Sequence, residues 1–207
     1  MKTKVFTLYT SSPNSQDLEK IAAELAKGAV MIYPTDTVYA MGCLSNHSKA
    51  LSQFARIRGI KLEKSQLSFL FKDISEVSNY VKPFNASIFR LLKQCLPGPY
   101  AFIMESVNKL PKPFNKRKTI GVRISSHPIL RELLPLLPAP LLTASLHDED
   151  EILQYTSDPE AILSLWDGRI DLLIDAGYGG NIPSTVIDLT TLPYDVLRYG
   201  KGGVDFL

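Results

Sequence analysis

Hydrophobic residues recur along this chain at two spacings, which together predict amphipathic helices that alternate with short buried strands. The three-to-four-residue spacing of a helix appears at residues 18–25, 50–57 and 88–95. Gly28 lies where the first of these helices should end, because glycine is favoured just beyond a helix C-terminus. The sequence Pro-Gly-Pro at 97–99 should end the third.

Two further sequences are typical of a helix start. In the sequence Ser157-Asp158-Pro159-Glu160, Ser157 can act as the N-cap and Pro159 fits the first turn. The pair His127-Pro128 carries the same proline signal. We therefore expect a helix to begin at each of these two sequences.

Short apolar runs without helical spacing predict the strands of a buried sheet. These runs are residues 5–8, 29–33, 67–71, 100–104, 119–124, 172–175, 185–189 and 196–199. Some runs adjoin helices and others follow one another, which indicates an α/β fold with a mixed sheet flanked by helices. Because no repeat, low-complexity stretch or linker interrupts the pattern, we expect a single domain over residues 1–207.

Composition excludes several classes of protein. The chain is 45% hydrophobic and 21% charged, with a formal net charge of +2, so it is neither disordered nor basic enough to bind nucleic acid through bulk charge. The near-neutral total conceals a separation along the chain. Residues 109–131 hold seven basic residues and no acidic one, whereas residues 147–175 hold nine acidic residues and one arginine. A local cationic pocket sized for a nucleotide is therefore compatible with this composition.

Membrane and metal signatures are missing from the sequence. No apolar run approaches the roughly 20 residues that cross a bilayer. The two cysteines, Cys43 and Cys95, and the three histidines lack metal-ligand spacing, so we expect no bound metal and reduced thiols. We expect a soluble, cytoplasmic protein. No H-E-x-x-H, G-x-S-x-G or G-x-G-x-x-G sequence identifies a catalytic residue.

Polar residues in a loop after the buried run 29–33 are the first candidate site. Thr35, Asp36 and Thr37 follow Pro34 directly. Loops at strand ends often carry ligand-binding groups, although threonine and aspartate also satisfy backbone groups in ordinary turns. From chemistry alone the ordinary turn is favoured.

A basic cluster near the end of the second predicted helix is another candidate. Residues 56–72 hold five basic residues and one acidic residue. Such a cluster can bind phosphate groups, but basic residues at a helix C-terminus also offset the helix dipole. The four basic residues nearest the helix end are Arg56, Arg58, Lys61 and Lys64.

Arg123 ends an otherwise apolar run, and a buried charge without a partner is costly. Its partner is either an internal aspartate or the carboxylate or phosphate of a ligand, both of which suit the planar guanidinium.

Near the C-terminus, glycines at 177, 179 and 180 precede the hydroxyl pair Ser184-Thr185. This arrangement lets backbone approach an anion closely, and it is also found in ordinary glycine turns.

The order of these motifs resembles the YrdC/YciO family over about residues 29–203. The motifs are Y-P-T-D-T-V-Y-A-M-G at 33–42, R-I-R-G at 56–59, P-G-P at 97–99, G-V-R at 121–123, S-T-V-I-D-L at 184–189 and L-R-Y-G at 197–200. The resemblance implies a twisted, mostly parallel mixed sheet with a concave basic surface. It also implies a threonylcarbamoyl-adenylate synthase, which joins threonine, bicarbonate and ATP in the tRNA N6-threonylcarbamoyladenosine pathway.

The resemblance also implies roles for individual residues. The amino acid would be bound by Thr35, Arg123 and Thr185, with Thr37 supporting the loop. The nucleotide would be bound by Arg58, Thr119, Ser145 and Arg198. ATP would be a substrate together with Mg²⁺, and no side chain is assigned as a catalytic nucleophile. Some members of the family favour double-stranded RNA, for which the candidates are Arg56, Arg58, Lys61 and Lys64.

Four positions depart from the pattern of the synthases, and the chain resembles the YciO branch more than the YrdC branch. Where the family pattern has polar or charged residues, this sequence has Ile60, Ala101 and Ala144, and it has His147 in place of an asparagine. Losing several ligand groups weakens binding by a few kcal/mol. The resemblance therefore implies a synthase with weak or altered activity. The alternative is a non-catalytic relative that binds double-stranded RNA, tRNA or rRNA.

Overall fold

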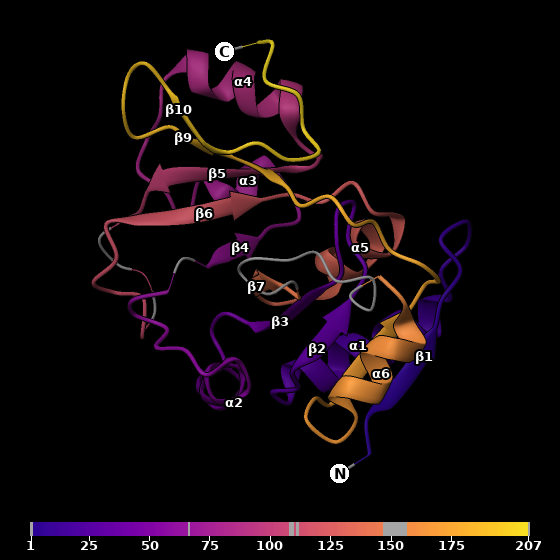
Figure 1. The fold of residues 1–207 in the computed structure, drawn as a ribbon. Helices are drawn as coiled ribbons and strands as arrows, with labels where there is room; N and C mark the ends of the chain where they lie inside the picture. The colour runs from indigo at the N-terminus through magenta and orange to yellow at the C-terminus, as the bar shows by residue number, and fades with distance from the viewer. Residues whose placement is uncertain (1, 66, 108–109, 111, 147–156, 207) are drawn as a thin grey trace.

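The structure is a computed structural model that describes residues 2–65, 67–107, 110, 112–146 and 157–206. In this part of the chain, ten strands form one mixed sheet (Figure 1). They are β1 Lys4–Thr7, β2 Met31–Tyr33, β3 Ala40–Leu44, β4 Ser68–Leu70, β5 Tyr100–Glu105, β6 Thr119–Arg123, β7 Leu141–Ser145, β8 Leu172–Asp175, β9 Thr185–Asp188 and β10 Asp195–Arg198. Each of the apolar runs in the sequence overlaps one of these strands.

The strand order in the sheet is β1-β8-β2-β3-β7-β4-β6-β5-β9-β10. Four neighbouring pairs are parallel and five are antiparallel, so the mixed sheet is confirmed but the mostly parallel sheet that the resemblance implied is wrong. The strands β3 and β7 were not expected. Both strands contain apolar residues, but β3 begins inside the motif at 33–42, which we interpreted as a loop, and β7 directly follows a stretch broken by three prolines.

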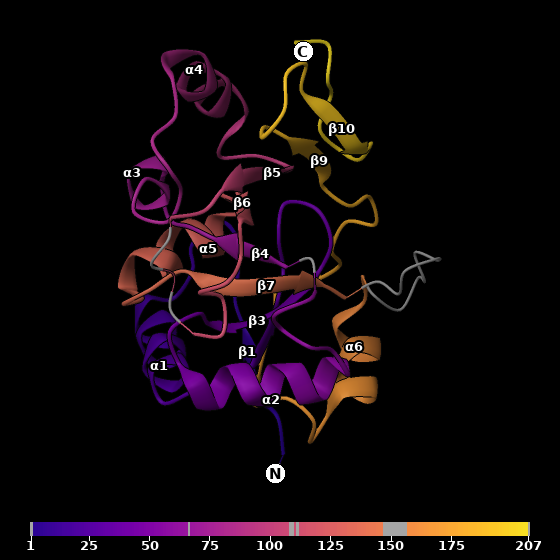
Figure 2. The same ribbon diagram turned by 90° about the vertical axis from the view of Figure 1, so that its left-hand side faces the viewer.

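Helices cover the two faces of the sheet, with α1 and α6 on opposite sides in Figure 2. The helices are α1 Ser15–Ala26, α2 Ser48–Arg58, α3 Ile74–Val77, α4 Ala86–Cys95, α5 Pro128–Leu133 and α6 Pro159–Trp166, and a 3₁₀ turn at Leu134–Leu136 follows α5. Among the described residues, no helix is long and apolar enough to cross a membrane.

Local capping explains where the helices begin and end. Asn14 accepts hydrogen bonds from the backbone N–H groups of the first turn of α1, and Gly59 ends α2 in the left-handed conformation with φ +64°. The expectation that Ser157 caps α6 is wrong. Asp158 is the N-cap, because its carboxylate lies 3.0 Å from the backbone nitrogen of Glu160 and Pro159 follows it directly in the first turn.

Alternating side chains of the central strands point into two separate hydrophobic cores. One core, which includes Met41, Phe69 and Val122, packs against α2, α3, α4 and α6. The other, which includes Ala40 and Leu70, packs against α1 and α5. Because side chains alternate along a strand, the residues beside Val122 and Phe69 in β6 and β4 face the α1 and α5 side. This is the side on which Arg123 lies.

Candidate functional site

The loop between β2 and β3 is folded around two buried threonine hydroxyls. The Thr35 hydroxyl donates to the carbonyl oxygen of Val38 at 2.6 Å and accepts from the backbone N–H of Thr37 at 3.1 Å. The two hydroxyl oxygens lie 3.0 Å apart. Both side chains are buried. These bonds fix the loop and leave the Thr37 oxygen as an acceptor for a group from another strand.

That group is the Arg123 guanidinium, which ends β6. Its Nη2 donates to the Thr37 hydroxyl at 3.2 Å and lies 3.6 Å from the Asp36 carboxylate. Burial lowers the pKa of Arg123, and the Asp36 carboxylate opposes this shift. The Arg123 Nε is buried and has no hydrogen-bond partner among the residues that the structure describes. The expected partner of Arg123 was either an internal aspartate or a ligand. The structure shows the aspartate, Asp36, and also leaves the Nε donor without a partner among the described residues.

Asp36 is anchored from the segment that follows Arg123. Its carboxylate accepts from the Ser125 hydroxyl at 2.8 Å, and from the backbone N–H and the hydroxyl of Ser126, both at 3.2 Å. The ammonium of Lys201 donates to the Asp36 backbone carbonyl at 2.7 Å. No role was predicted for Ser125, Ser126 or Lys201. The hydroxyl pair just after the strand that carries Arg123 was the available signal.

The segment from Ser184 to Gly202 completes this cluster. The Ser184 hydroxyl lies 3.5 Å from the Thr37 hydroxyl, and its carbonyl accepts from Arg198 Nε at 3.1 Å and Nη2 at 2.9 Å. The Thr185 hydroxyl donates to the Gly202 carbonyl at 2.6 Å. Of the two neighbouring hydroxyls, it is therefore that of Ser184 which meets Thr37. The Thr185 hydroxyl holds the C-terminal segment.

Thr119 begins β6 at the opposite end from Arg123, and Ser145 ends β7 beside Ala40, where the loop between β2 and β3 ends. Four residue steps, or about 13 Å, separate Thr119 from Arg123 along the strand. Thr143, Ser68 and Gly121 lie side by side in the sheet. Ser145, the last residue of β7, and Thr119, the first residue of β6, are therefore at the same end of the sheet. Ser145 therefore lies at the base of the threonine loop, and Thr119 is level with it in the sheet.

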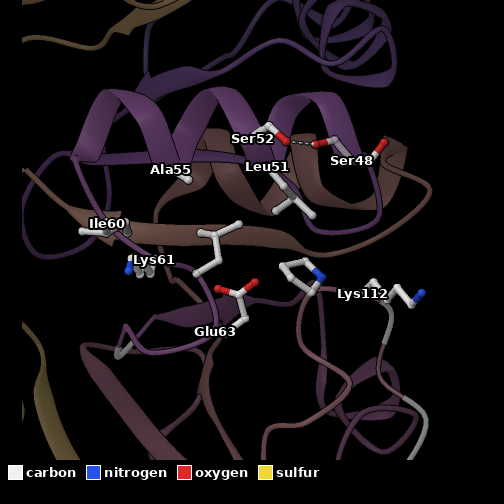
Figure 3. A pocket seen from close by; sticks show the side chains of 10 residues that line it. Ser48, Leu51, Ser52, Ala55, Ile60, Lys61, Glu63 and Lys112 are labelled. Carbon is white, nitrogen blue, oxygen red and sulfur yellow. Dashed lines mark hydrogen bonds between the residues drawn. The ribbon is translucent and has the colours of Figure 1, made fainter.

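The basic residues near the end of α2 are at a third location. Arg56, Lys61 and Lys64 are exposed, whereas Arg58 is half-buried. Lys61 lines a pocket of about 390 Å³ below α2, together with Glu63, Lys112 and apolar side chains (Figure 3). This pocket shares no lining residue with the cluster around Arg123.

Three of the four residues that depart from the family pattern lie in the described part of the fold. Ile60 and Ala144 pack against the core on the α2 side, and Ala101 is buried in β5 beside Val186 of β9. Ala144 therefore points away from the face that carries Ser145. His147 lies outside the described residues.

Gly180 is placed where only glycine fits beside the threonine loop. A Cβ atom there would overlap the Thr37 backbone carbonyl. We expect Gly180→Ala to displace the loop and to lower the free energy of unfolding by about 1–3 kcal/mol, measured by urea unfolding. The matched control is Gly203→Ala, because the nearest atom to a Cβ at Gly203 is 3.8 Å away. Equal stability of the two variants would contradict the close approach.

His127, which precedes α5, makes the stability of this region depend on pH. Its Nδ1 is buried without a hydrogen-bond partner among the described residues. Burial lowers the pKa of His127 below its usual value of 6.5, and Asp36 partly opposes the shift. The folded state therefore binds fewer protons than the unfolded state just below that value.

Stability should consequently fall as the pH falls through this range. We expect the free energy of unfolding to decrease from about pH 7 to about pH 5, and to decrease less in His127→Asn. Urea unfolding at each pH measures both. The same decrease in the two proteins would show that His127 is not responsible.

The fold and the site together define an α/β protein in which a buried arginine meets hydroxyl groups on one face of a mixed sheet. The model of the Sua5_yciO_yrdC family, described as "Telomere recombination", matches residues 23–200. The chain belongs to the Sua5/YciO/YrdC family. It is 36% identical over 205 residues to the uncharacterized protein YciO of Escherichia coli K12, an alignment that covers 98% of each chain.

Other relatives and solved structures agree with this assignment. The threonylcarbamoyl-AMP synthase of Homo sapiens is 30% identical over 191 residues, which cover 92% of this chain and 66% of the human protein. The crystal structure of E. coli YciO matches with a TM-score of 0.89, 35% identity and 98% coverage of both chains. Pyrococcus abyssi Sua5, solved with L-threonine, shares the fold, with a TM-score of 0.85, 22% identity and coverage of 96% of this chain and 58% of Sua5. Similarity to the YciO branch is therefore confirmed.

Among the described residues, no group of three or more histidine, cysteine, aspartate or glutamate side chains is arranged to hold a metal ion. Both cysteines are buried and unpaired, and burial raises the pKa of Cys43 to about 12. A thiol with a raised pKa is a poor nucleophile near neutral pH. The polar chemistry of the site therefore comes from arginine, hydroxyl and carboxylate groups.

Proposed function

We propose that this protein is an ATP-dependent L-threonylcarbamoyl-adenylate synthase or a close catalytic relative with weak or altered activity. The observation that carries the proposal is the Arg123 guanidinium, which is buried beside the hydroxyl cluster and whose Nε has no hydrogen-bond partner among the described residues. A buried cation with an unused donor is costly in free energy. A ligand acceptor that reaches the Arg123 guanidinium would therefore be bound with a favourable free energy. A carboxylate fits the planar guanidinium.

The proposed reaction needs no nucleophilic side chain. The threonine amine adds to bicarbonate or CO₂ to form a carbamate, and a carbamate oxygen attacks the α-phosphate of ATP. Pyrophosphate leaves, and bicarbonate loses one oxygen as water. The protein has to bind two substrates, orient them and stabilise negative charge, which arginine and hydroxyl groups can do.

Individual residues have distinct roles in this proposal. Arg123 binds the amino-acid carboxylate, and Thr35 and Thr37 hold the loop against it. In this proposal Arg198, Thr119 and Ser145 bind the nucleotide, as does Arg58 at the end of α2. Mg²⁺ enters with the triphosphate as part of the substrate. The relationship to the human threonylcarbamoyl-AMP synthase, and the fold shared with P. abyssi Sua5, which was solved with L-threonine, support threonine as the amino acid.

A turnover assay tests the proposal. The protein is incubated with ATP, threonine and bicarbonate, and both pyrophosphate and threonylcarbamoyl-AMP are measured. We expect product that depends on threonine and that decreases in Arg198→Ala. No threonine-dependent product under any of these conditions would refute the proposal.

Binding of RNA is a second candidate function, because Arg56, Lys61 and Lys64 form an exposed basic group near the end of α2. RNA binding of this kind weakens steeply as salt concentration rises. The reversal Lys64→Glu should lower affinity for double-stranded RNA, whereas Lys20→Glu on α1 should not. Equal affinity of the two variants would exclude this surface.

A further inference from the structure

Three cationic side chains meet around the loop at 35–37, and in the described part of the chain one carboxylate, that of Asp36, is paired with them. Arg123 is buried, Arg198 is half-buried and Lys201 is exposed. Arg198 donates to the Ser184 carbonyl, and the Ser184 hydroxyl lies 3.5 Å from the Thr37 hydroxyl that accepts from Arg123, so the two guanidinium groups border the same hydroxyl pair. Among the described residues, the carboxylate paired with this group is Asp36, at 3.6 Å from Arg123.

Lys201 has no carboxylate partner in the described part of the chain. Its ammonium donates to the backbone carbonyl of Asp36 at 2.7 Å, and a carbonyl has no formal charge with which to neutralise it. This bond is exposed to solvent, where such contacts contribute little to stability. The ammonium can therefore be transferred to a stronger acceptor at little cost.

The backbone that carries Lys201 is held firmly in place. The N–H of Lys201 donates to the Pro183 carbonyl at 2.8 Å. The N–H of Gly200 donates to the Thr185 hydroxyl at 3.0 Å, and the same hydroxyl donates to the Gly202 carbonyl at 2.6 Å. Because both flanking residues are anchored, a change of acceptor needs only a rotation of the Lys201 side chain.

The cluster has two positive charges more than it has negative charges, and its buried Arg123 Nε lacks a partner. One carboxylate of an amino acid would neutralise one of these charges. The remaining charge lies on the solvent side of the cluster, where the half-buried Arg198 and the exposed Lys201 are found. Lysine and arginine on that side are suited to phosphate oxygens.

We propose that Lys201 binds a phosphate group of the nucleotide substrate, and that its ammonium moves from the Asp36 carbonyl to a phosphate oxygen when the nucleotide binds. This inference rests on the proposed function of the same site. It adds a residue that the sequence motifs did not mark, and it assigns the C-terminal segment a direct part in substrate binding.

Binding measurements with Lys201→Met test the inference. ATP, inorganic pyrophosphate and threonine are titrated separately by calorimetry into the full-length protein. We expect affinity for ATP and for pyrophosphate to fall by about tenfold, the effect of losing one charge-assisted hydrogen bond, and affinity for threonine to change by less than about twofold. Lys201→Arg should retain most of the affinity. Lys93→Met, which removes an exposed lysine from α4, is the control and should match the natural protein.

The other outcomes either refute the inference or distinguish it from the proposed function. Unchanged affinity for ATP and pyrophosphate in Lys201→Met would refute it. An equal loss of threonine affinity would also refute it, because Lys201 would then only hold the loop. If the natural protein binds neither ATP nor pyrophosphate, both proposals fail. If phosphate binding depends on Lys201 but threonine gives no turnover, the inference stands and the synthase proposal fails.

Discussion

Replacing Arg123 with methionine should lower the affinity for threonine by at least about a hundredfold, which corresponds to about 2.7 kcal/mol. The guanidinium is buried between Thr37 and Asp36, and its Nε is the unused donor of the cluster. Methionine fills similar space but provides no charge and no hydrogen-bond donor. Calorimetric titration with threonine measures the loss.

Two further variants make this result specific. Arg131→Met removes an exposed arginine of α5 that donates to the Lys72 carbonyl, and this variant should bind threonine normally. Arg123→Lys keeps the positive charge beside Asp36 but lacks the planar pair of donors, so it should bind more weakly than the natural protein while remaining folded. Threonine affinity in Arg123→Met within about threefold of the natural value would remove the central support for the proposed function.

Replacing Phe69 with alanine should lower the free energy of unfolding by about 3–5 kcal/mol and the Tm by about 10 °C. The Phe69 ring is fully buried, and its centroid lies 5.1 Å from that of Phe114 and 6.2 Å from those of Phe71 and Tyr80. Alanine would remove these ring contacts and leave a cavity. Urea and thermal unfolding measure the effect.

An exposed phenylalanine provides the comparison. Phe89 on α4 is 43% exposed, so Phe89→Ala should cost much less stability than Phe69→Ala. A similar loss in both variants would show that the aromatic cluster around Phe69 does not anchor the fold. Because Phe69 lies in β4 next to β6, whose last residue is Arg123, the large destabilisation should also weaken ligand binding.

The sequence pattern predicted the architecture well, because most strands and helices carry their own local signals. Hydrophobic spacing located eight of the strands in the described chain, and glycine or proline located several helix ends. The strands β3 and β7 were missed because β3 overlaps the polar motif at 33–42 and prolines interrupt the apolar stretch before β7. Residues Ala40 and Ser145 are partners across more than 100 positions of sequence, and no local pattern reports such a pairing.

The site was predictable in its residue types but not in its contacts. Thr35, Arg123 and Arg198 were singled out, and the structure places them in one cluster linked by Thr37 and Ser184. The hydroxyl that meets Thr37 belongs to Ser184 and not to its neighbour Thr185, because side chains of adjacent residues point in different directions. The Asp36 contacts with Ser125 and Lys201 arise from tertiary folding.

The contact between Lys201 and the Asp36 carbonyl spans 165 residues of sequence. The loop that carries Asp36 leaves the ribosome 165 residues before Lys201 does. The arginine, the threonine loop and this lysine therefore meet only after Lys201 has been synthesised, and contacts at such long sequence separation are slow to form because the entropy of closing the intervening chain must be overcome first. Chains cleaved before Lys201 would lack its ammonium, so they should not compete with the intact protein for nucleotide.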